Sequence, residues 1–196
     1  MRRTLFPDYP SVMPTLQFRA NAHLTSLWTA APGEVLDLFD RDRERLRAWC
    51  PWVDGCRSLE SLQEVMAAAR RDFDEQKALW FVIRHRDAVV GVMGLYDLRA
   101  SDRRSSIACM VEEAHEGLGL VYDAGAALTC YGMDALGLIR IEAQTAAENR
   151  RGIKTMERLG FRREGVLRCA QWLHDRPVDN VVYSLTAQDP RPRRIG

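Results

Sequence analysis

Residues 107–124, IACMVEEAHEGLGLVYDA, contain the features that decide the fold. The apolar beginning predicts a strand over 105–111, and the spacing of apolar residues after Gly119 predicts a helix from about Val121. Gly117 and Gly119 allow positive φ angles and a close approach of backbone to a ligand. The helix start presents unpaired N–H groups and the positive end of a helix dipole, which suits a pyrophosphate, although the same spacing is also typical of a simple tight turn.

The segments on either side of this stretch predict a mixed order of strands and helices. Ser58 and Asn149 are suitable helix N-caps, and Gly160 is suited to end the helix that Asn149 begins. This order indicates an α+β fold around one sheet. The predicted strands are 16–18, 24–28, 79–83, 88–95, 105–111, 138–143, one from Phe161 onward and 180–185; the predicted helices are 33–49, one from Ser58 with Leu59, Leu62, Met66, Ala69 and Phe73 on its apolar face, one from about Val121, and one from Asn149 to Leu159.

Composition and charge exclude several classes of protein. The 196 residues carry 28 basic and 27 acidic side chains, a net charge of +1, so nothing indicates a nucleic-acid or membrane partner. No apolar stretch has the length of a membrane span, and the Pro-containing beginning is not typical of a signal peptide. Five scattered cysteines indicate free thiols in a reducing cytoplasm rather than a metal site. We expect a single domain over 15–188, an irregular arm over 1–14 and a flexible tail over 189–196.

Residues 107–119 resemble the acetyl-CoA loop of the GNAT acetyltransferases, most closely that of the RimJ/RimL type, which acts on ribosomal-protein N-termini. The resemblance spans roughly residues 15 to 187, and the combination of pieces at this spacing is specific although no single piece is. The other segments similar to that subfamily are 49–53, 57–60, 138–143, Asn149, 158–165, Asp179 and Tyr183.

The resemblance implies a three-layer α/β/α fold with a mixed, mostly antiparallel sheet of about seven strands. The sheet would be splayed in the middle, with helices on both faces and acetyl-CoA in the gap as the acyl donor. Backbone N–H groups near Met110 and Val111 would polarise the thioester carbonyl while a free amine attacks it directly. The other implied cofactor-binding residues are Glu116, Gly117, Leu118, Gly119, Leu120, Val121, Gly152 and Asn149, the last of which would hold the pantetheine arm.

Four residues depart from the family pattern. Glu116 stands where Arg or Gln is usual, and a carboxylate there repels a pyrophosphate unless it turns outward. Gly152 replaces a Ser that can donate to the departing thiolate, and Met156 stands where other members have a Tyr. Gln171 occupies the catalytic position of the subfamily's proposed Glu base, but an amide cannot take the proton.

Several other side chains have both a functional and a plainer interpretation. Cys169 is a candidate neighbour of the thiolate or else part of the core, and Glu164 is a candidate acceptor contact or else a structural carboxylate. His115 is a candidate base or else a turn residue on the surface. His174 is a candidate base or substrate contact or else an exposed residue of a hairpin turn. The aromatic residues also have two interpretations. A wall for an amine, or else buried packing, is expected of Trp49, Trp52 and Trp80. Tyr122 would contact the cofactor or be exposed at the surface.

We therefore predict an acetyl-CoA-dependent N-acetyltransferase whose acceptor is a protein N-terminus or a small amine. The alternative is a catalytically degenerate acyl-CoA-binding or regulatory protein, which the four departures suggest. An unrelated α+β binding module would require the resemblance to be accidental. We expect a cytoplasmic protein without a metal, and the family's frequent dimerisation makes a homodimer plausible.

Overall fold

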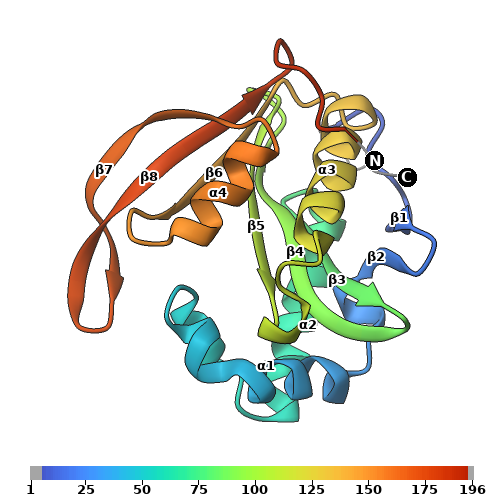
Figure 1. Ribbon diagram of the computed structural model, residues 1–196. Helices are drawn as coiled ribbons and strands as arrows, with labels where there is room; N and C mark the ends of the chain where they lie inside the picture. The colour runs from blue at the N-terminus through green and yellow to red at the C-terminus, as the bar shows by residue number, and fades with distance from the viewer. Residues whose placement is uncertain (1–5, 194–196) are drawn as a thin grey trace.

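The computed structural model describes residues 6–193 and contains one open sheet of eight strands (Figure 1). The strand order is β1-β2-β3-β4-β5-β6-β8-β7, and all neighbours are antiparallel except β5 and β6. The predicted α+β class and the mostly antiparallel mixed sheet are confirmed. The strands are β1 Leu16–Arg19, β2 Ala22–Ser26, β3 Leu79–His85, β4 Ala88–Arg99, β5 Arg104–Val111, β6 Arg140–Ala146, β7 Arg162–Leu173 and β8 Arg176–Thr186.

The parallel pair β5–β6 joins the two halves of the sheet only at its N-terminal ends. The pairing covers three consecutive residue pairs and stops at Ser106 and Glu142. Beyond them β5 continues to Val111 beside β4 alone, and β6 continues to Ala146 beside β8 alone. The strands therefore diverge toward their C-terminal ends, as Figure 1 shows, and the predicted splay in the middle of the sheet is confirmed.

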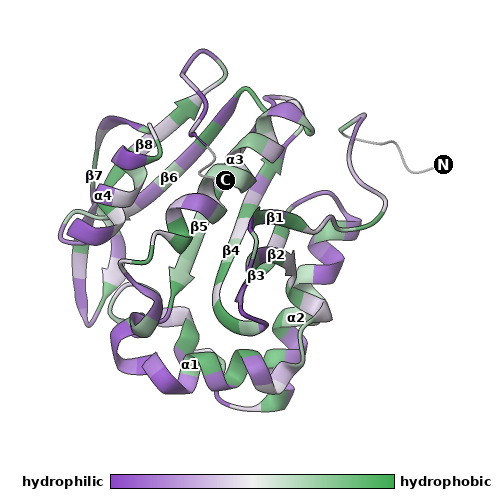
Figure 2. Cartoon of the chain, turned by 45° about the vertical axis from the view of Figure 1, so that its right-hand side comes forward, coloured by the Kyte–Doolittle hydropathy of each residue, from purple (hydrophilic) through white to green (hydrophobic). Residues whose placement is uncertain are grey.

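Helices cover both faces of the sheet. On one face α1 (Pro32–Arg47) and α2 (Leu59–Asp74) contact β4 and β3, and on the other α3 (Leu120–Asp134) contacts β4 and β5 while α4 (Arg150–Arg158) contacts β6 (Figure 1). Two cores result, one under α1 and α2 and one under α3. Figure 2 shows hydrophobic colour along β4 and mostly hydrophilic colour on α4. Three short 3-10 helices complete the chain: η1 Leu27–Thr29, η2 Pro51–Gly55 and η3 Glu113–His115.

Two local predictions are wrong. The strand predicted over 24–28 ends at Ser26, because Thr29 donates its hydroxyl to the Ser26 carbonyl at 2.9 Å and the chain turns into η1. Leu59, predicted on the apolar face of α2, is 47% exposed because it lies in the first turn, beside the cap and away from the sheet. The sheet has eight strands, in agreement with the expected number of about seven.

Both ends of the described chain pack against the rest of the fold. Phe6 is buried in the core under α3, and Asp189 pairs with Arg162 at 2.9 Å. The described parts of the predicted arm and tail are therefore in contact with the domain, whereas residues 1–5 and 194–196 lie outside the described residues. The predicted domain boundaries remain a proposal.

Residues 6–193 lack two features, a helix suited to span a membrane and a cluster of metal ligands. None of the helices in that range is both long and apolar enough to cross a membrane. The same residues bring together no group of three His, Cys, Asp or Glu side chains that could hold a metal ion.

Candidate active site

The loop between β5 and α3 lies at the open end of the gap between β5 and β6 (Figure 1). Gly117 and Gly119 adopt φ angles of +75° and +76°, in the left-handed region that glycine enters without a Cβ penalty. A Cβ at Gly119, the N-cap of α3, would stand 2.9 Å from Nη2 of Arg19. Arg19 donates to the Leu118 carbonyl at 2.9 Å and pairs with Asp123 at 2.5 Å, so β1 fixes the loop against the helix start.

Consecutive backbone N–H groups from Gly117 to Tyr122 donate to no protein group within residues 6–193. The first bond into α3 runs from the N–H of Asp123 to the Gly119 carbonyl, at 3.0 Å. Free donors together with the positive end of a 15-residue helix form the arrangement that binds phosphate anions. The predicted residues 117–121 thus form one continuous donor loop, and its chemistry fits a diphosphate.

Glu116, whose charge would repel a phosphate, is neutralised by arginines from both sides of the gap. Its Oε1 lies 2.7 Å from Nη1 of Arg45 in α1, and its Oε2 accepts from Arg151 at the start of α4. Arg45 is itself fixed by Asp42 and by the Val111 carbonyl, to which it donates at 2.5 Å. The Glu116 carboxylate is therefore matched by two guanidinium groups, and the donor loop keeps its positive character.

The C-terminal half of β5 presents backbone groups to the gap. Glu112 donates its N–H to the Val90 carbonyl of β4 at 2.9 Å. Because N–H groups alternate in direction along a strand, the N–H of Met110 also points to β4, whereas that of Val111 points into the gap. The Met110 side chain is buried in the core under α1 and α2. Of the two predicted groups, Val111 thus has the N–H that faces the gap, and the catalytic role of both stays a prediction.

Asn149 and Gly152 are joined in the cap of α4. The Oδ1 of Asn149 accepts the Gly152 N–H at 3.0 Å, and its Nδ2 donates to Thr145 Oγ1 at 2.8 Å. A Cβ at Gly152 would stand 2.9 Å from that Nδ2, so glycine leaves room for the folded-over amide. One Nδ2 hydrogen has no partner among the described residues, and the contact of Asn149 with a cofactor stays a prediction.

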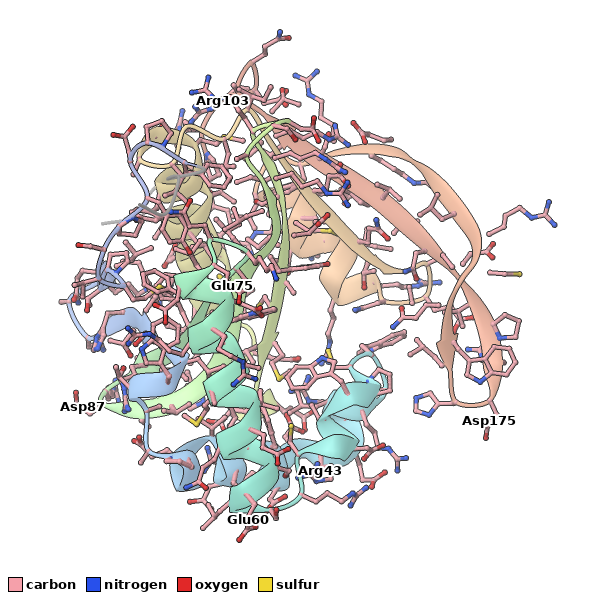
Figure 3. All side chains as sticks on the ribbon, turned by 180° about the vertical axis from the view of Figure 1, so that it is seen from behind. Arg43, Glu60, Glu75, Asp87, Arg103 and Asp175 are labelled. Carbon is pink, nitrogen blue, oxygen red and sulfur yellow. The ribbon has the colours of Figure 1, made fainter. Side chains whose placement is uncertain are left out.

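Gln171 lies near the tip of the long β7–β8 hairpin. It is opposite Val178, and two further residue pairs separate it from the turn that contains Asp175. Figure 3 labels Asp175 at the free end of this hairpin, beyond the helices. The Gln171 side chain is half-buried, and no hydrogen bond of the described chain joins it to Val111. Its catalytic role therefore stays a prediction that the hairpin geometry alone does not support.

A charged cluster connects β6 with its neighbours on both sides. Arg140 donates to both carboxylate oxygens of Glu164 and to Glu142, and Arg104 donates to the same Glu142 oxygen at 2.7 Å. Hydrogen bonds from Arg140 and then from Ser184 lower the pKa of Glu164 to about 2. Glu164 is thus a fixed anion at neutral pH, bound by its neighbours, rather than a group ready to take a proton.

The other candidates take structural positions. Cys169 is exposed in a bulge of β7 and donates its N–H to Asp179 Oδ1 at 2.9 Å, so it is not part of the core. His174 has φ +48° and is exposed in the hairpin turn, as its plainer interpretation predicts. His115 lies with Nδ1 2.6 Å from Glu112 Oε1 and is only partly exposed.

Three residues of the site region were not predicted from the sequence. Arg45 and Arg151 are 71 and 35 residues from Glu116, so no local pattern links them to it. Tyr96 stacks on Trp80 with ring centroids 5.8 Å apart and an interplanar angle of 11°. The only sequence signal for Tyr96 is the alternation along its strand, which places it on the same face as other even-numbered residues.

Comparison with known proteins agrees with this geometry. A family model described as an acetyltransferase (GNAT) domain matches residues 27–162. The uncharacterized N-acetyltransferase YoaA of Bacillus subtilis (strain 168) is 27% identical over 136 residues, which cover 67% of this chain and 77% of YoaA. The putative ribosomal N-acetyltransferase YdaF of the same organism is 24% identical over 174 residues, 87% of this chain and 95% of YdaF.

A similar solved structure is Mycobacterium smegmatis RimJ in complex with CoA-disulfide. Its TM-score to this chain is 0.83 at 22% sequence identity, over 93% of this chain and 90% of that one. At this identity the likeness shows a shared fold.

Proposed function

Because the chain belongs to the GNAT acetyltransferase family, we propose that it is an N-acetyltransferase that transfers an acetyl group from acetyl-CoA to a primary amine. The acceptor is a protein N-terminus or a small amine. The observation that carries the proposal is the run of free N–H groups from Gly117 to Tyr122 at the open end of a splayed sheet. The similarity to the putative ribosomal N-acetyltransferase YdaF supports a ribosomal protein among the acceptors.

Different residues around the gap would bind different parts of the cofactor. When bound, acetyl-CoA supplies a thioester carbonyl that an amine attacks and a thiolate that leaves. The N–H groups from Gly117 to Val121 would bind the diphosphate, with Arg45 and Arg151 beside them. The unpartnered Nδ2 hydrogen of Asn149 would contact the pantetheine arm. The Val111 N–H would polarise the carbonyl.

Two of the predicted acceptor-side residues do not offer a proton acceptor. Gln171 is an amide, and Glu164 is already bound by Arg140 and Ser184. An α-amine, with a pKa of about 8, loses its proton to water far more readily than a lysine side chain, with a pKa of about 10.4. An α-amine therefore needs less help with deprotonation than a lysine-like amine.

The second candidate function is a degenerate acyl-CoA-binding or regulatory protein. It is favoured by the residues at three family catalytic positions, Gly152, Met156 and Gln171, none of which can exchange a proton. Cofactor binding without acetylation of any amine would support it. Robust turnover with a single amine would exclude it.

Two measurements test the proposal. Saturating acetyl-CoA should raise the melting temperature, because a ligand at 100 times its Kd stabilises the native state by about 2.7 kcal/mol. CoA release, followed over a panel of N-terminal peptides and small amines, should then identify at least one acceptor. No melting shift with either acetyl-CoA or CoA would refute both candidate functions.

The cell compartment and the assembly state belong to the same proposal. We infer a cytoplasmic protein from the free cysteines and the ribosomal type of a relative. We infer a homodimer because members of the family often dimerise. Light scattering during size-exclusion chromatography would measure the assembly directly.

A further inference from the structure

A cavity of about 460 Å³ lies between α2, β3 and β4, far from the loop that holds Gly117. Its walls come from the C-terminal end of α2, the beginning of β3 and the second half of β4. Tyr96 in this wall is opposite Ser106, the last residue of β5 that pairs with β6. Along the strands, the cavity therefore starts at the level of the last β5–β6 residue pair. Figure 3 labels Glu75, which follows the C-terminal end of α2.

An aromatic wall connects this cavity with the middle of β5. The wall consists of the stacked rings of Trp80 and Tyr96, both half-buried. Trp80 lies directly on Gly94 of β4, where a Cβ would stand 2.3 Å from the indole Cε3. Gly94 is opposite Ala108 of β5, so the indole lies one strand from the edge that faces the gap. Because Gly94 has no side chain, the Trp80 ring lies directly against the backbone of β4.

Carboxylates dominate the charge of the cavity. The backbone carbonyl of Asp72 accepts the N–H groups of Lys77 and Ala78 at 2.7 and 3.3 Å. The half-buried carboxylate of Asp72 makes no hydrogen bond or ion pair with any residue between 6 and 193, and its charge acts on Lys77. Asp97 lies on the rim and pairs with Arg99 at 3.0 Å, whereas Lys77 is neutralised by Glu75 at 2.6 Å. Asp72 also stands in the last turn of α2, where the negative end of the helix dipole disfavours a carboxylate. The stability of the helix therefore does not explain its presence.

We propose that this cavity is a second acceptor subsite, which receives an ammonium or guanidinium group carried by the amine substrate. A cation there meets the faces of the aromatic wall and the carboxylates of Asp72 and Asp97. The proposal rests on the proposed acetyl transfer, because it extends the acceptor side of that site. Tyr96 lies four residues along β4 from Val92, which is opposite Met110, so the aromatic wall and the Met110–Val111 end of β5 are roughly 13 Å apart along the sheet. An acceptor that reaches both would need a cation at about that distance from its reacting amine.

Two kinds of acceptor have this charge spacing. An extended peptide spans about 3.3–3.6 Å per residue, so a protein N-terminus with a basic residue at its third or fourth position is one of them. A long polyamine is the other. The chemistry they share is a reacting amine with a distant cation, and separate arms of the experiment distinguish the two.

The test uses variants that remove charge without changing shape. Asp72→Asn, Asp97→Asn and the double variant are compared with Glu64→Gln, a control at an exposed position of α2 outside the cavity. Asn keeps the left-handed backbone of residue 97, where φ is +51°. Asp72→Asn should leave the melting temperature unchanged or raise it, because it removes a charge from the negative end of the helix.

Each variant is measured with paired acceptors. A tetrapeptide that ends in arginine amide is paired with one that ends in glutamine amide, and a polyamine with an alkylamine of equal length. KM is measured in acetyl transfer, and Kd by calorimetry in the presence of CoA. In the double variant we expect KM and Kd to rise about tenfold for the cationic acceptors, with no change for the neutral ones or for CoA.

The wall gives an independent check. Tyr96→Leu removes a π face but no charge, and it should weaken cationic acceptors several-fold, whereas Tyr96→Phe should not. Equal affinity of the unaltered protein for cationic and neutral acceptors, or equal losses for both in the double variant, overturns the subsite. If no acceptor is acetylated at all, acetyl transfer fails on its own, while calorimetry still reports whether a cationic acceptor binds through Asp72.

Discussion

The two ends of the sheet gap are built from different chemistry. At the open end the polar groups are backbone N–H groups from Gly117 to Tyr122, fixed by two glycines and a helix start. At the closed end they are side chains from segments far apart in the sequence, among them Arg140, Glu164 and Tyr96. A site made of backbone needs only small residues and a helix, so it keeps its function when the side chains around it differ from the family pattern. The closed end depends on its side chains, so substitutions there change its chemistry directly.

The most direct way to break the open end is Gly119→Val. A Val at φ +76° is strained, and its Cβ would stand 2.9 Å from Arg19 Nη2. We expect the Kd for CoA to rise roughly 10- to 100-fold, about 1.4–2.8 kcal/mol. Calorimetry would measure it, with Gly33→Val as the control because nothing lies within 4 Å of a Cβ at Gly33. Unchanged CoA affinity in Gly119→Val would contradict the assigned loop.

A restored carboxylate on the β7–β8 hairpin should act in the opposite direction. Gln171→Glu places a potential base at the position that matches the subfamily's Glu, and we expect kcat/KM to rise about tenfold. The pH–rate profile should gain a limb at acidic pH, because a carboxyl group must lose its proton before it can act as a base. Gln171→Leu serves as the control and should leave the rate near that of the unaltered protein. No gain from Gln171→Glu would remove this residue from the site.

A smaller effect is expected at the cap of α4. Asn149→Ala removes the acceptor of the Gly152 N–H and should lower the free energy of unfolding by about 1 kcal/mol. If Asn149 also contacts the cofactor, the stabilisation by acetyl-CoA should fall in addition. Thermal unfolding with and without acetyl-CoA separates the two effects. A cap role alone would leave the stabilisation by the ligand intact.

The smallest effect concerns Glu164, whose pKa lies at about 2 because Arg140 and Ser184 donate to it. A depressed pKa means that the folded state favours the ionised form, so the stabilisation is complete above about pH 4.5 and is lost as the pH falls toward 2. Since Glu164 is partly exposed, Glu164→Gln should cost only about 0.5 kcal/mol at pH 7. The melting temperatures of the two proteins should converge near pH 2, and a difference that persisted there would contradict this account.

The open end could be predicted from the sequence because its determinants are local. Gly117, Gly119 and the helix start are neighbours in the chain, and Asn149 lies three residues from the N–H it caps. The same local rules predicted most helices and strands. They failed for Leu59, where the position of the helix on the sheet decides exposure rather than the periodicity of the helix.

The side-chain contacts around the gap could not be predicted because they are long-range. Arg45 reaches Glu116 across 71 residues, and Trp80 meets Tyr96 across a hairpin through the space that Gly94 leaves. Spacing rules within one helix or strand contain no information about such pairs. For Glu116 the consequence is large, since the sequence indicates repulsion of a phosphate, whereas the structure pairs its carboxylate with two arginines.

We expect the N–H groups of the loop after β5 to bind the diphosphate of acetyl-CoA. Amide proton and nitrogen resonances, followed by NMR during a titration with CoA, report on these groups one by one. The resonances of Gly117, Gly119 and Val121 should shift strongly and saturate together. Saturating CoA that leaves these three resonances in place, whatever it does elsewhere, would contradict this expectation.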